Sequence, residues 1–357
     1  MKKISKLMIF ALVLLISMSL FVACGDSTDT SDNDTKKEDA NNKDTEKEDT
    51  NINNEPKNEE VKLNVATLKG PTGMGMSKLM EDVKKGDSNL DLNFSVYGAP
   101  DQLIGKITSG EVDIAAVPSN MASILYNKTK GNVKLAGINT LGVLYILDTT
   151  GEIETMEDLK GKTIYASGKG ATPDYIIRYL LKENGIDPEK DVTLDFKSQH
   201  AELAAQVASG DAPIALLPQP HVTTATMKNK DVKIAINLTE EWEKVKGKNS
   251  KLAMGAIIVN KDVAKKNKDA VNKFLDEYEK SINWVNDNHE DAGKLIEKHG
   301  ILPKAKLAKM AIPKSNIVFI DSEKSQEVLK DFYKVLFEFN PKSLGGKIPN
   351  EDFYYER

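Results

Sequence analysis

The order of apolar and polar positions in the main part of the chain predicts alternating strands and helices. VKLNVAT (61–67) and LDLNFSVY (90–97) have the alternation of strands, and VDIAAV (112–117) is an apolar run typical of a buried strand. Between them, residues 72–85 and 100–109 have the spacing of amphipathic helices. This alternation predicts an α/β fold built on a parallel, doubly wound sheet.

The same order of strands and helices recurs 100 residues later. KTIYA (162–166), VTLDF (192–196) and APIALL (212–217) read as strands, with helices from Thr172 and from about Ala201. Identical residues recur at this offset at turns and strand ends: Lys69 and Lys169, Gly70 and Gly170, Thr72 and Thr172, Ser109 and Ser209, Gly110 and Gly210, Pro118 and Pro218. We therefore expect two similar lobes, each with a Lys-Gly-x-Thr loop at a helix start. Convergence of two βαβ units on the same turn chemistry is the alternative explanation.

Two apolar stretches lead into and out of the second unit. GVLYILDTT (142–150) and LAMGAIIVNKD (252–262) are interpreted as extended crossings, as a hinge between lobes requires. One lobe is expected to comprise residues 61–143 and 253–357, and the other residues 144–252.

The rest of the chain after the second crossing is expected to be almost wholly helical. Helical apolar spacing covers residues 263–288, 289–299 and 323–338.

The first 24 residues have the features of a secretory signal. Three lysines precede an uncharged apolar run over residues 7–22, which is shorter than the ~20 residues of a membrane span. Ala23 then precedes Cys24, the only cysteine, in an arrangement that resembles the lipobox of bacterial lipoproteins. This resemblance implies lipidation of Cys24; an ordinary secretory signal is the alternative. The core has no cysteine left for a disulfide or a thiol nucleophile.

Residues 25–60 have the composition of a disordered acidic tether. They contain 13 acidic residues and 5 lysines, with almost no large apolar side chain. The whole chain has a net charge of −5, and the signal contributes +3 and the tether −8. Residues 61–357 therefore carry no net charge, and no basic surface indicates nucleic acid.

Four phrases of the core resemble, in the same order, the substrate-binding proteins of ABC importers. They are KGPTGMG (69–75), GAPDQLIGKITSGEVDIAAVPSN (98–120), IETMEDLKGKTIYASGKGATPDYIIRYLLKENGIDP (153–188) and SGDAPIALLPQP (209–220). The group serving nitrate, sulfonates, taurine and thiamine-precursor pyrimidines is the most similar.

The resemblance implies a type 2 periplasmic-binding-protein-like fold, with two doubly wound sheets joined by a two-strand hinge. A small solute, expected to be a sulfonate, another oxyanion or a heterocyclic precursor, would be captured between closing lobes and passed to a membrane permease with its ATPase. We expect a monomer without a cofactor, outside the cytoplasm, and attached to the outer face of the cell membrane only by its lipid.

The candidate ligand-binding residues lie where strands end and helices begin. In open α/β sheets, ligands bind at the carboxyl ends of strands, where helix N-termini offer free N–H groups. The candidates are Lys69, Gly70, Pro71, Thr72, Gly73, Tyr97, Ser119, Asn120, Ser167, Gly170, Ala171, Thr172, Gln219 and His221.

Some candidates have an equally simple structural interpretation. Thr72 and Thr172 could be helix N-caps that never touch a ligand, and Tyr97 could pack within its lobe. Lys69 could neutralise an anion or remain solvated, and His221 could be a surface histidine.

The motifs of common enzymes are incomplete in this chain. Gly161-Lys162-Thr163 would end a phosphate-binding loop, but Met156 stands where that loop needs its first glycine. Four scattered histidines are expected to form no close pair, which argues against a metal receptor. We therefore expect no enzyme. A ligand-sensing lipoprotein of the same fold without transport, or a protein like the pyrimidine-precursor enzymes, remains an alternative.

Overall fold

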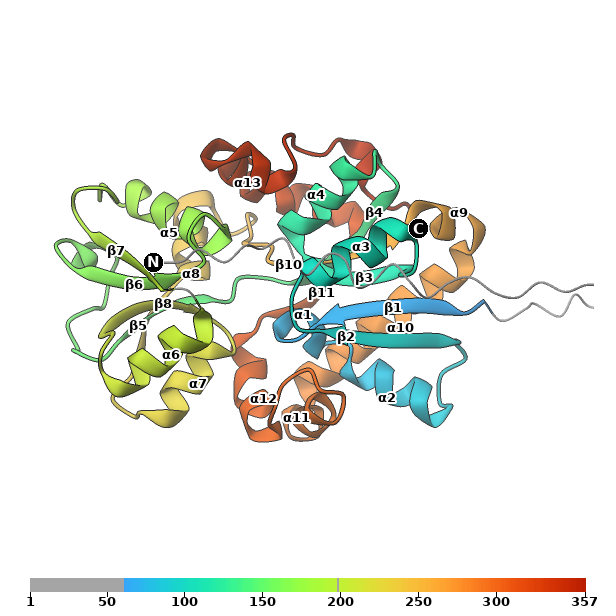
Figure 1. Cartoon of the computed structure of the whole chain (residues 1–357), viewed down its shortest axis with the longest axis horizontal. Coiled ribbons are helices and arrows are strands. Elements are labelled where there is room, and N and C mark those ends of the chain that lie inside the picture. Colours follow the sequence, from blue (N-terminus) through green and yellow to red (C-terminus); the bar gives the residue numbers. More distant parts are fainter. Residues whose placement is uncertain (1–60, 198) are drawn as a thin grey trace, which may run out of the picture. The chain divides into compact units, whose positions relative to one another are not determined.

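The computed structural model describes residues 61–197 and 199–357, so the signal and tether expected for residues 1–60 lie outside the described residues. Two β-sheets with their covering helices make up the described part (Figure 1). We call them the first and second lobe, in chain order. Within the described ranges, no helix is long and apolar enough to span a membrane.

The chain builds the first lobe in two passes, with the second lobe between them. The first pass comprises β1 (Leu63–Leu68), α1 (Pro71–Met74), α2 (Ser77–Lys85), β2 (Leu92–Tyr97), α3 (Asp101–Ser109), β3 (Ile114–Pro118), α4 (Ser119–Lys128) and β4 (Val133–Thr140). The second lobe comprises β5 (Leu144–Asp148), β6 (Thr163–Ser167), α5 (Thr172–Glu183), β7 (Thr193–Lys197), α6 (His200–Ser209), β8 (Ile214–Pro218), α7 (His221–Lys228), β9 (Lys233–Asn237) and α8 (Leu238–Lys246). The return pass comprises β10 (Gly255–Asn260), α9 (Lys261–Lys266), α10 (Lys268–Asp287), α11 (His289–Lys298), α12 (Ala305–Ala311), β11 (Ile317–Asp321) and α13 (Ser322–Phe339).

The two sheets share one strand order, as the repeat in the sequence predicts. The first sheet runs β11-β4-β10-β3-β1-β2, and the second, read from its other edge, runs β9-β5-β8-β6-β7. Strands β1 and β6, which are equivalent at the offset of 100, each pair in parallel with two neighbours. The repeat is therefore a structural one.

The sheets are mixed rather than wholly parallel. Strand β10 pairs antiparallel with β3 and β4, and its counterpart β5 pairs antiparallel with β8 and β9. Most of the two expected crossings thus lies inside the sheets, as β5 and β10. The alternation of strands and helices did not reveal this, because each of these strands arrives directly from the other lobe.

The first crossing is tightly held by its neighbours. The backbone N–H of Leu141 donates to Asn316 O (3.0 Å), and the side chain of Asn316 donates to Gly142 O. A Cβ atom at Gly142 would lie only 2.0 Å from the hydroxyl oxygen of Thr239 in α8. A larger residue at this position would require the side chain of Thr239 to move.

Three details of the expected secondary structure were wrong. The helix expected over residues 72–85 is divided into α1 and α2 at Gly75, where a Cβ would lie 2.6 Å from Ile282 in α10. Strand β11 interrupts the tail expected to be helical, and neither β4 nor its counterpart β9 was predicted. All eight residues of β4 are buried, including Lys134 and Asn139, because distant parts of the chain supply their hydrogen-bond partners.

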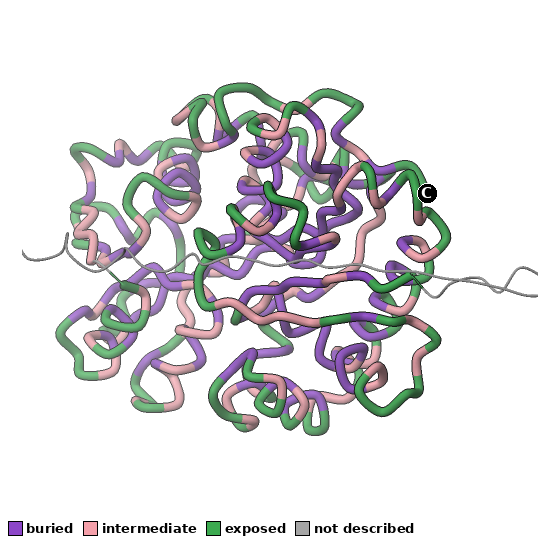
Figure 2. The backbone as a smooth tube through the Cα atoms, turned by 45° about the vertical axis from the view of Figure 1, so that its right-hand side comes forward, coloured by how far each residue is buried: buried purple, intermediate pink, exposed green. Residues whose placement is uncertain are grey.

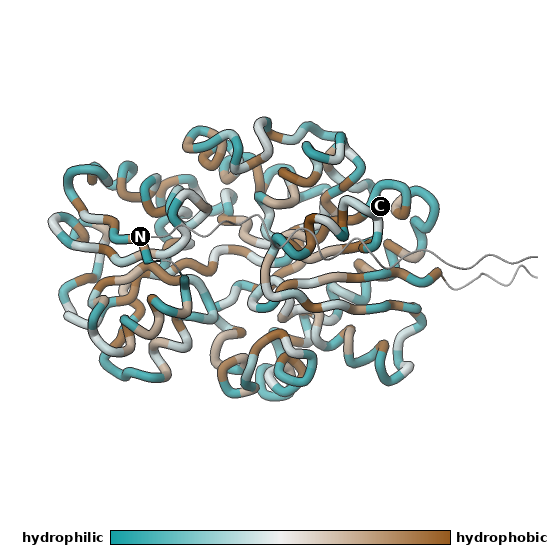
Figure 3. The backbone as a smooth tube through the Cα atoms, viewed as in Figure 1, coloured by the Kyte–Doolittle hydropathy of each residue, from teal (hydrophilic) through white to brown (hydrophobic). Residues whose placement is uncertain are grey.

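The apolar core follows the strands of both sheets and the inner faces of the helices (Figures 2 and 3). Helix α13 belongs to the return pass but also packs against α5 of the second lobe. At its end the Phe339 ring stacks on Tyr175, with ring centroids 5.8 Å apart, and Asn340 donates to the Tyr175 hydroxyl (2.9 Å). Helix α13 therefore joins the two lobes in addition to the crossings.

Candidate functional site

The candidates of the first lobe lie at the carboxyl ends of β1, β2 and β3. The backbone N–H of Lys69 donates to Tyr97 O (2.9 Å), which brings the ends of β1 and β2 together. The Lys69 side chain is exposed and belongs to no ion pair among the described residues, whereas Tyr97 is half-buried against the core. Lys69 is thus the charged group of this edge that is free to meet an anion.

The two loop threonines stand inside their helices and do not cap them. Pro71 is the first residue of α1 and Thr72 the second, and the N-cap is Gly70. Thr172 is the first residue of α5, whose N-cap is the exposed Ala171. The interpretation of Thr72 and Thr172 as N-caps was therefore wrong. Both hydroxyls are half-buried and lack a hydrogen-bond partner within the described part of the chain.

The glycines of the two loops serve the fold in different ways. A Cβ at Gly73 would lie 2.2 Å from Leu68 O, so close packing within the lobe explains this glycine. Gly70 and Gly170 both have a positive φ (95° and 71°), which favours glycine. Their N–H groups are not the free donors that the sequence suggested, since Ile301 O accepts from Gly70 (3.3 Å).

The N–H of Gly170 is bound in a small network that positions the second loop. It donates to the Asp174 carboxylate (2.8 Å), which also accepts from Arg178 Nε (2.5 Å). The Tyr175 hydroxyl donates to Gly170 O (2.5 Å). These hydrogen bonds fix the loop around Gly170. In this loop Lys169 remains exposed and Thr172 half-buried.

Ser119 and Gln219 occupy equivalent positions in the repeat. The backbone N–H of each is hydrogen-bonded to one of the two crossings. The N–H of Ser119 donates to Met254 O (3.0 Å), and the N–H of Gln219 donates to Val143 O (2.9 Å). The Ser119 hydroxyl also donates to Ala253 O, and Asn120 donates to Ser343 O (3.3 Å). The side chains of Ser119 and Asn120 are therefore already engaged by the fold.

Gln219 differs from Ser119 in having a polar atom without a partner. The Thr223 hydroxyl donates to Oε1 of Gln219 (2.7 Å), so the other terminal atom of the Gln219 side chain is the amide nitrogen, Nε2. Among the residues that the structure describes, this buried Nε2 has no hydrogen-bond partner. An unpaired buried donor is costly, so it is a natural place to expect an acceptor from outside the protein.

The second lobe also gathers Ser167, His200 and His221 at the carboxyl ends of β6, β7 and β8. The Ser167 hydroxyl forms a hydrogen bond with His200 Nδ1, and the two imidazole rings have centroids 5.5 Å apart. The expectation of no close histidine pair was wrong, and His200 was missed. Its sequence signal was available, since it begins a helix directly after a strand, as His221 does.

Both histidines are half-buried. Burial lowers the pKa of His200, and burial together with the neighbouring His200 lowers the pKa of His221 to about 4. Both rings are therefore neutral near pH 7. His221 is half-buried and in contact with a second ring, which differs from a freely exposed surface histidine.

The predicted residues thus form two groups, one at the carboxyl edge of each sheet. Between residues 61–197 and 199–357, no hydrogen bond directly joins Lys69, Thr72 or Tyr97 to the second-lobe candidates. The lobes do meet nearby, where the Tyr145 hydroxyl of β5 donates to Lys314 O (2.8 Å). Both groups consist mainly of donors: hydroxyls, an amide, imidazoles and two lysines.

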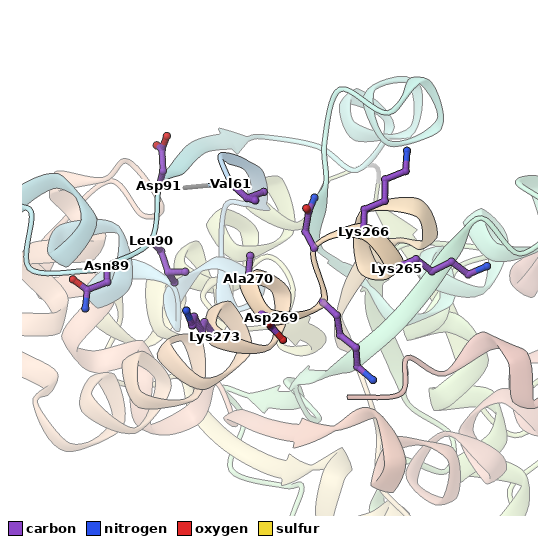
Figure 4. A pocket seen from close by; sticks show the side chains of 11 residues that line it. Val61, Asn89, Leu90, Asp91, Lys265, Lys266, Asp269, Ala270 and Lys273 are labelled. Atoms are coloured by element: carbon purple, nitrogen blue, oxygen red, sulfur yellow. The ribbon is translucent and has the colours of Figure 1, made fainter. Parts of the chain in front are cut away.

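A hollow of about 350 Å³ lies elsewhere, at the amino ends of β1 and β2. Figure 4 shows it between the segment around Leu90 and the lysines of α9 and α10. None of the predicted ligand-binding residues lines this hollow or the three others described in the structure. The described residues also contain no cluster of three or more side chains suited to a metal ion.

Two α/β lobes with a shared strand order, joined by two crossings and with donors at the carboxyl ends of their strands, form a two-lobed periplasmic-binding-protein fold. A family model described as "ABC transporter, phosphonate, periplasmic substrate-binding protein" matches residues 75–303. The chain belongs to this family of periplasmic substrate-binding proteins of ABC transporters.

Part of the chain is also similar to a curated protein. The Bacillus subtilis (strain 168) protein YtlA, whose name describes it as a binding protein, is 26% identical over 208 residues. This match covers 57% of the present chain and 59% of the length of YtlA.

Solved structures share the fold. An ABC transporter protein from Parabacteroides distasonis has a TM-score of 0.70 at 23% identity, covering 83% of this chain and 99% of that one. The periplasmic aliphatic sulphonate-binding protein SsuA from Escherichia coli has a TM-score of 0.62 at 17% identity, covering 80% and 95%.

Proposed function

We propose that this protein is the extracytoplasmic receptor of an ABC importer, which captures a small oxyanion between its lobes and delivers it to a permease and its ATPase. The family match over residues 75–303 is the observation that carries this proposal. The receptor binds and releases its solute unchanged, without catalysis and as a monomer. The lobes that close are residues 61–143 with 253–357, and residues 144–252.

The chemistry of the strand ends supports an oxyanion of the phosphonate or sulfonate class. The free donors of the two groups are the hydroxyls of Thr72 and Thr172, the amide of Gln219 and the charged Lys69 and Lys169. The nearby carboxylate of Asp174 is already neutralised by Arg178. Hydrogen bonds from such donors are stronger when the acceptor is charged, which favours an anion over a neutral solute.

We further propose that Cys24 carries the lipid that holds the receptor at the outer face of the membrane. Support comes from the Ala23-Cys24 pair after the apolar run, followed by the acidic segment. Mass spectrometry of the protein extracted from cell membranes tests this proposal. A diacylglyceryl adduct at Cys24 is expected, and an unmodified N-terminus at another residue would contradict it.

The solute class is tested by a thermal-shift panel of phosphonates, sulfonates, nitrate, pyrimidines and neutral sugars. A rise in Tm with one or more oxyanions is expected, because a ligand that binds only the folded state stabilises it. A specific shift with a neutral sugar alone would contradict the proposed class.

The two-loop site is tested by Thr72→Val and Thr172→Val, measured by calorimetric titration with the tightest solute of the panel. Loss of one hydrogen bond to a charged group should weaken affinity by about 10- to 100-fold in each variant. Thr108→Val, on the exposed face of α3, is the matched control and should bind normally. Unchanged affinity in both loop variants would discard this site.

A further inference from the structure

Two imidazoles lie together at the strand ends of the second lobe without a counter-charge. His200 and His221 are the first residues of α6 and α7, and their ring centroids are 5.5 Å apart. No carboxylate pairs with either ring among the described residues, whereas His299 lies 3.1 Å from the carboxylate of Glu81. The two histidines are therefore held close while their charged forms are left without a partner.

The elements packed around the pair supply few charges that could change this. The ionisable groups on these elements are Tyr165 on β6, Asp195 and Lys197 on β7, Glu202 on α6, Lys228 on α7, and Lys306 and Lys309 on α12. Asp195 pairs with Lys197 (2.8 Å), and Lys309 pairs with Glu290 of α11. Neither pair offers a carboxylate to the histidines.

We propose that the histidine pair reads the charge of the solute, so that the receptor captures an anion together with a proton. This inference rests on the proposed function and concerns the same site. A negative charge beside two neighbouring neutral imidazoles favours protonation of one of them and so raises its pKa. A bound phosphonate or sulfonate supplies that charge, and a neutral solute does not.

The roles of the ring atoms follow from the contact with Ser167. The Ser167 hydroxyl is hydrogen-bonded to Nδ1 of His200, so Nε2 of that ring remains available to a solute or to His221. The ring of His221 has no hydrogen-bond partner in the described structure. Burial and the proximity of His200 lower the pKa of His221 to about 4. A bound anion would favour the protonated ring and would therefore raise this pKa toward neutral pH.

Linkage gives the sign of the pH dependence. If binding takes up a proton, affinity for a permanently charged anion rises as the pH falls, by up to about tenfold per pH unit for one proton. The rise should begin near the ordinary histidine pKa of 6.5 and continue toward the lowered value of His221. A solute without charge should show no such rise.

The test is calorimetric titration of the full chain with methanesulfonate and methylphosphonate at pH 6.5, in buffers of different ionisation enthalpy. Methanesulfonate keeps one negative charge at this pH, and the proton exchange of methylphosphonate itself is subtracted. Wild-type protein should take up between about 0.3 and 1 proton per bound anion, and His221→Asn should lose most of this uptake.

His289→Asn is the matched control, because His289 also begins a helix, α11, but contacts no second imidazole. It should keep the wild-type proton uptake. Binding with no proton uptake by the wild-type protein would overturn the inference and leave the proposed function intact. Failure of both anions to bind at any pH from 5.5 to 8 would overturn the inference together with the proposed solute class.

Discussion

Gly73 shows how one residue of a predicted binding loop is explained by packing. It lies where α1 approaches the end of β1, so closely that a Cβ would lie 2.2 Å from Leu68 O and 3.0 Å from Thr67 Oγ1. The carbonyl belongs to the backbone and cannot rotate away. Glycine at this position is therefore required by the first lobe, whether or not a solute is bound.

Gly73→Ala should lower the free energy of unfolding by about 2–3 kcal/mol, because overpacking against backbone forces the loop to move. Gly105→Ala is the control, since no atom lies within 4 Å of a Cβ there. In the middle of α3 it should raise stability by about 0.5–1 kcal/mol. Urea unfolding measures both. Wild-type stability in Gly73→Ala would contradict this account.

Glu81 is a buried carboxylate held by a lysine and a histidine at the end of a different helix, α11. Its side chain accepts from Lys298 Nζ (2.8 Å) and contacts His299 Nε2 (3.1 Å). The hydrogen bond from Lys298, with smaller contributions from His299 and Lys85, lowers the pKa of Glu81 to about 2 against the cost of burial. These contacts fix α11 to α2 beneath the first loop.

The lowered pKa of Glu81 stabilises the folded protein above its ordinary pKa of 4.5, and this stabilisation is lost as the pH falls toward 2. Glu81→Gln should therefore cost about 2–3 kcal/mol at pH 7 and roughly half of that or less at pH 3. Glu277→Gln removes a surface pair with Lys280 and should cost less than about 0.5 kcal/mol. Equal losses in Glu81→Gln at both pH values, by urea unfolding, would contradict the assignment.

Among the elements, the crossing at residues 141–143 is the segment most constrained by its surroundings. Thr239 of α8 lies against Gly142, and its buried hydroxyl has no hydrogen-bond partner within residues 61–197 and 199–357. Helix α8 thus fits the crossing closely at the expense of one unsatisfied polar atom. Such a contact fixes where the chain passes from one lobe to the other.

Gly142→Ala should destabilise the protein by about 1–3 kcal/mol through the clash with Thr239. Thr239→Ala should be neutral or slightly stabilising, because its hydroxyl is unpaired. In the double variant, removal of the hydroxyl should recover more than half of the loss, so the two effects are not additive. Chemical unfolding of the three variants measures the coupling, and strictly additive losses would count against a direct clash.

The elements that sequence reasoning identified are those whose signal is local. Apolar alternation or an apolar run in the sequence marks β1, β2, β3 and their counterparts in the second lobe. The identical residues at an offset of 100 relate the two lobes. Strand β4 was not predicted because its buried Lys134 pairs with Asp352, which lies more than 200 residues away in the sequence. The antiparallel places of β5 and β10 depend equally on the other lobe.

The site was predictable to the same extent. The loops at the strand ends were correctly placed, because parallel strands followed by helices define them locally. Whether Gly70 and Gly170 had free N–H groups depended on Ile301 and Asp174, which the loop sequences do not show. The pairing of His200 with His221 depended on the packing of α6 against α7. The roles of the predicted ligand-binding residues remain predictions.

At the scale of the whole molecule, the account requires the lobes to close on a solute. The two crossings and the contact of Phe339 with Tyr175 join the lobes, and the donor groups lie at the strand ends of each sheet. Ser109 and Ser209 are exposed, equivalent positions that follow from the repeat, one in each lobe. Labels at these positions would report the separation of the lobes.

The most direct measurement is energy transfer between dyes at Ser109→Cys and Ser209→Cys, in a chain in which Cys24→Ser removes the other thiol. The tightest oxyanion of the panel should shift the transfer efficiency at a concentration that matches its Kd. Thr72→Val and Thr172→Val, one in each lobe, should each move the midpoint to higher concentration. A solute that binds by calorimetry but leaves the transfer efficiency unchanged would contradict capture by lobe closure.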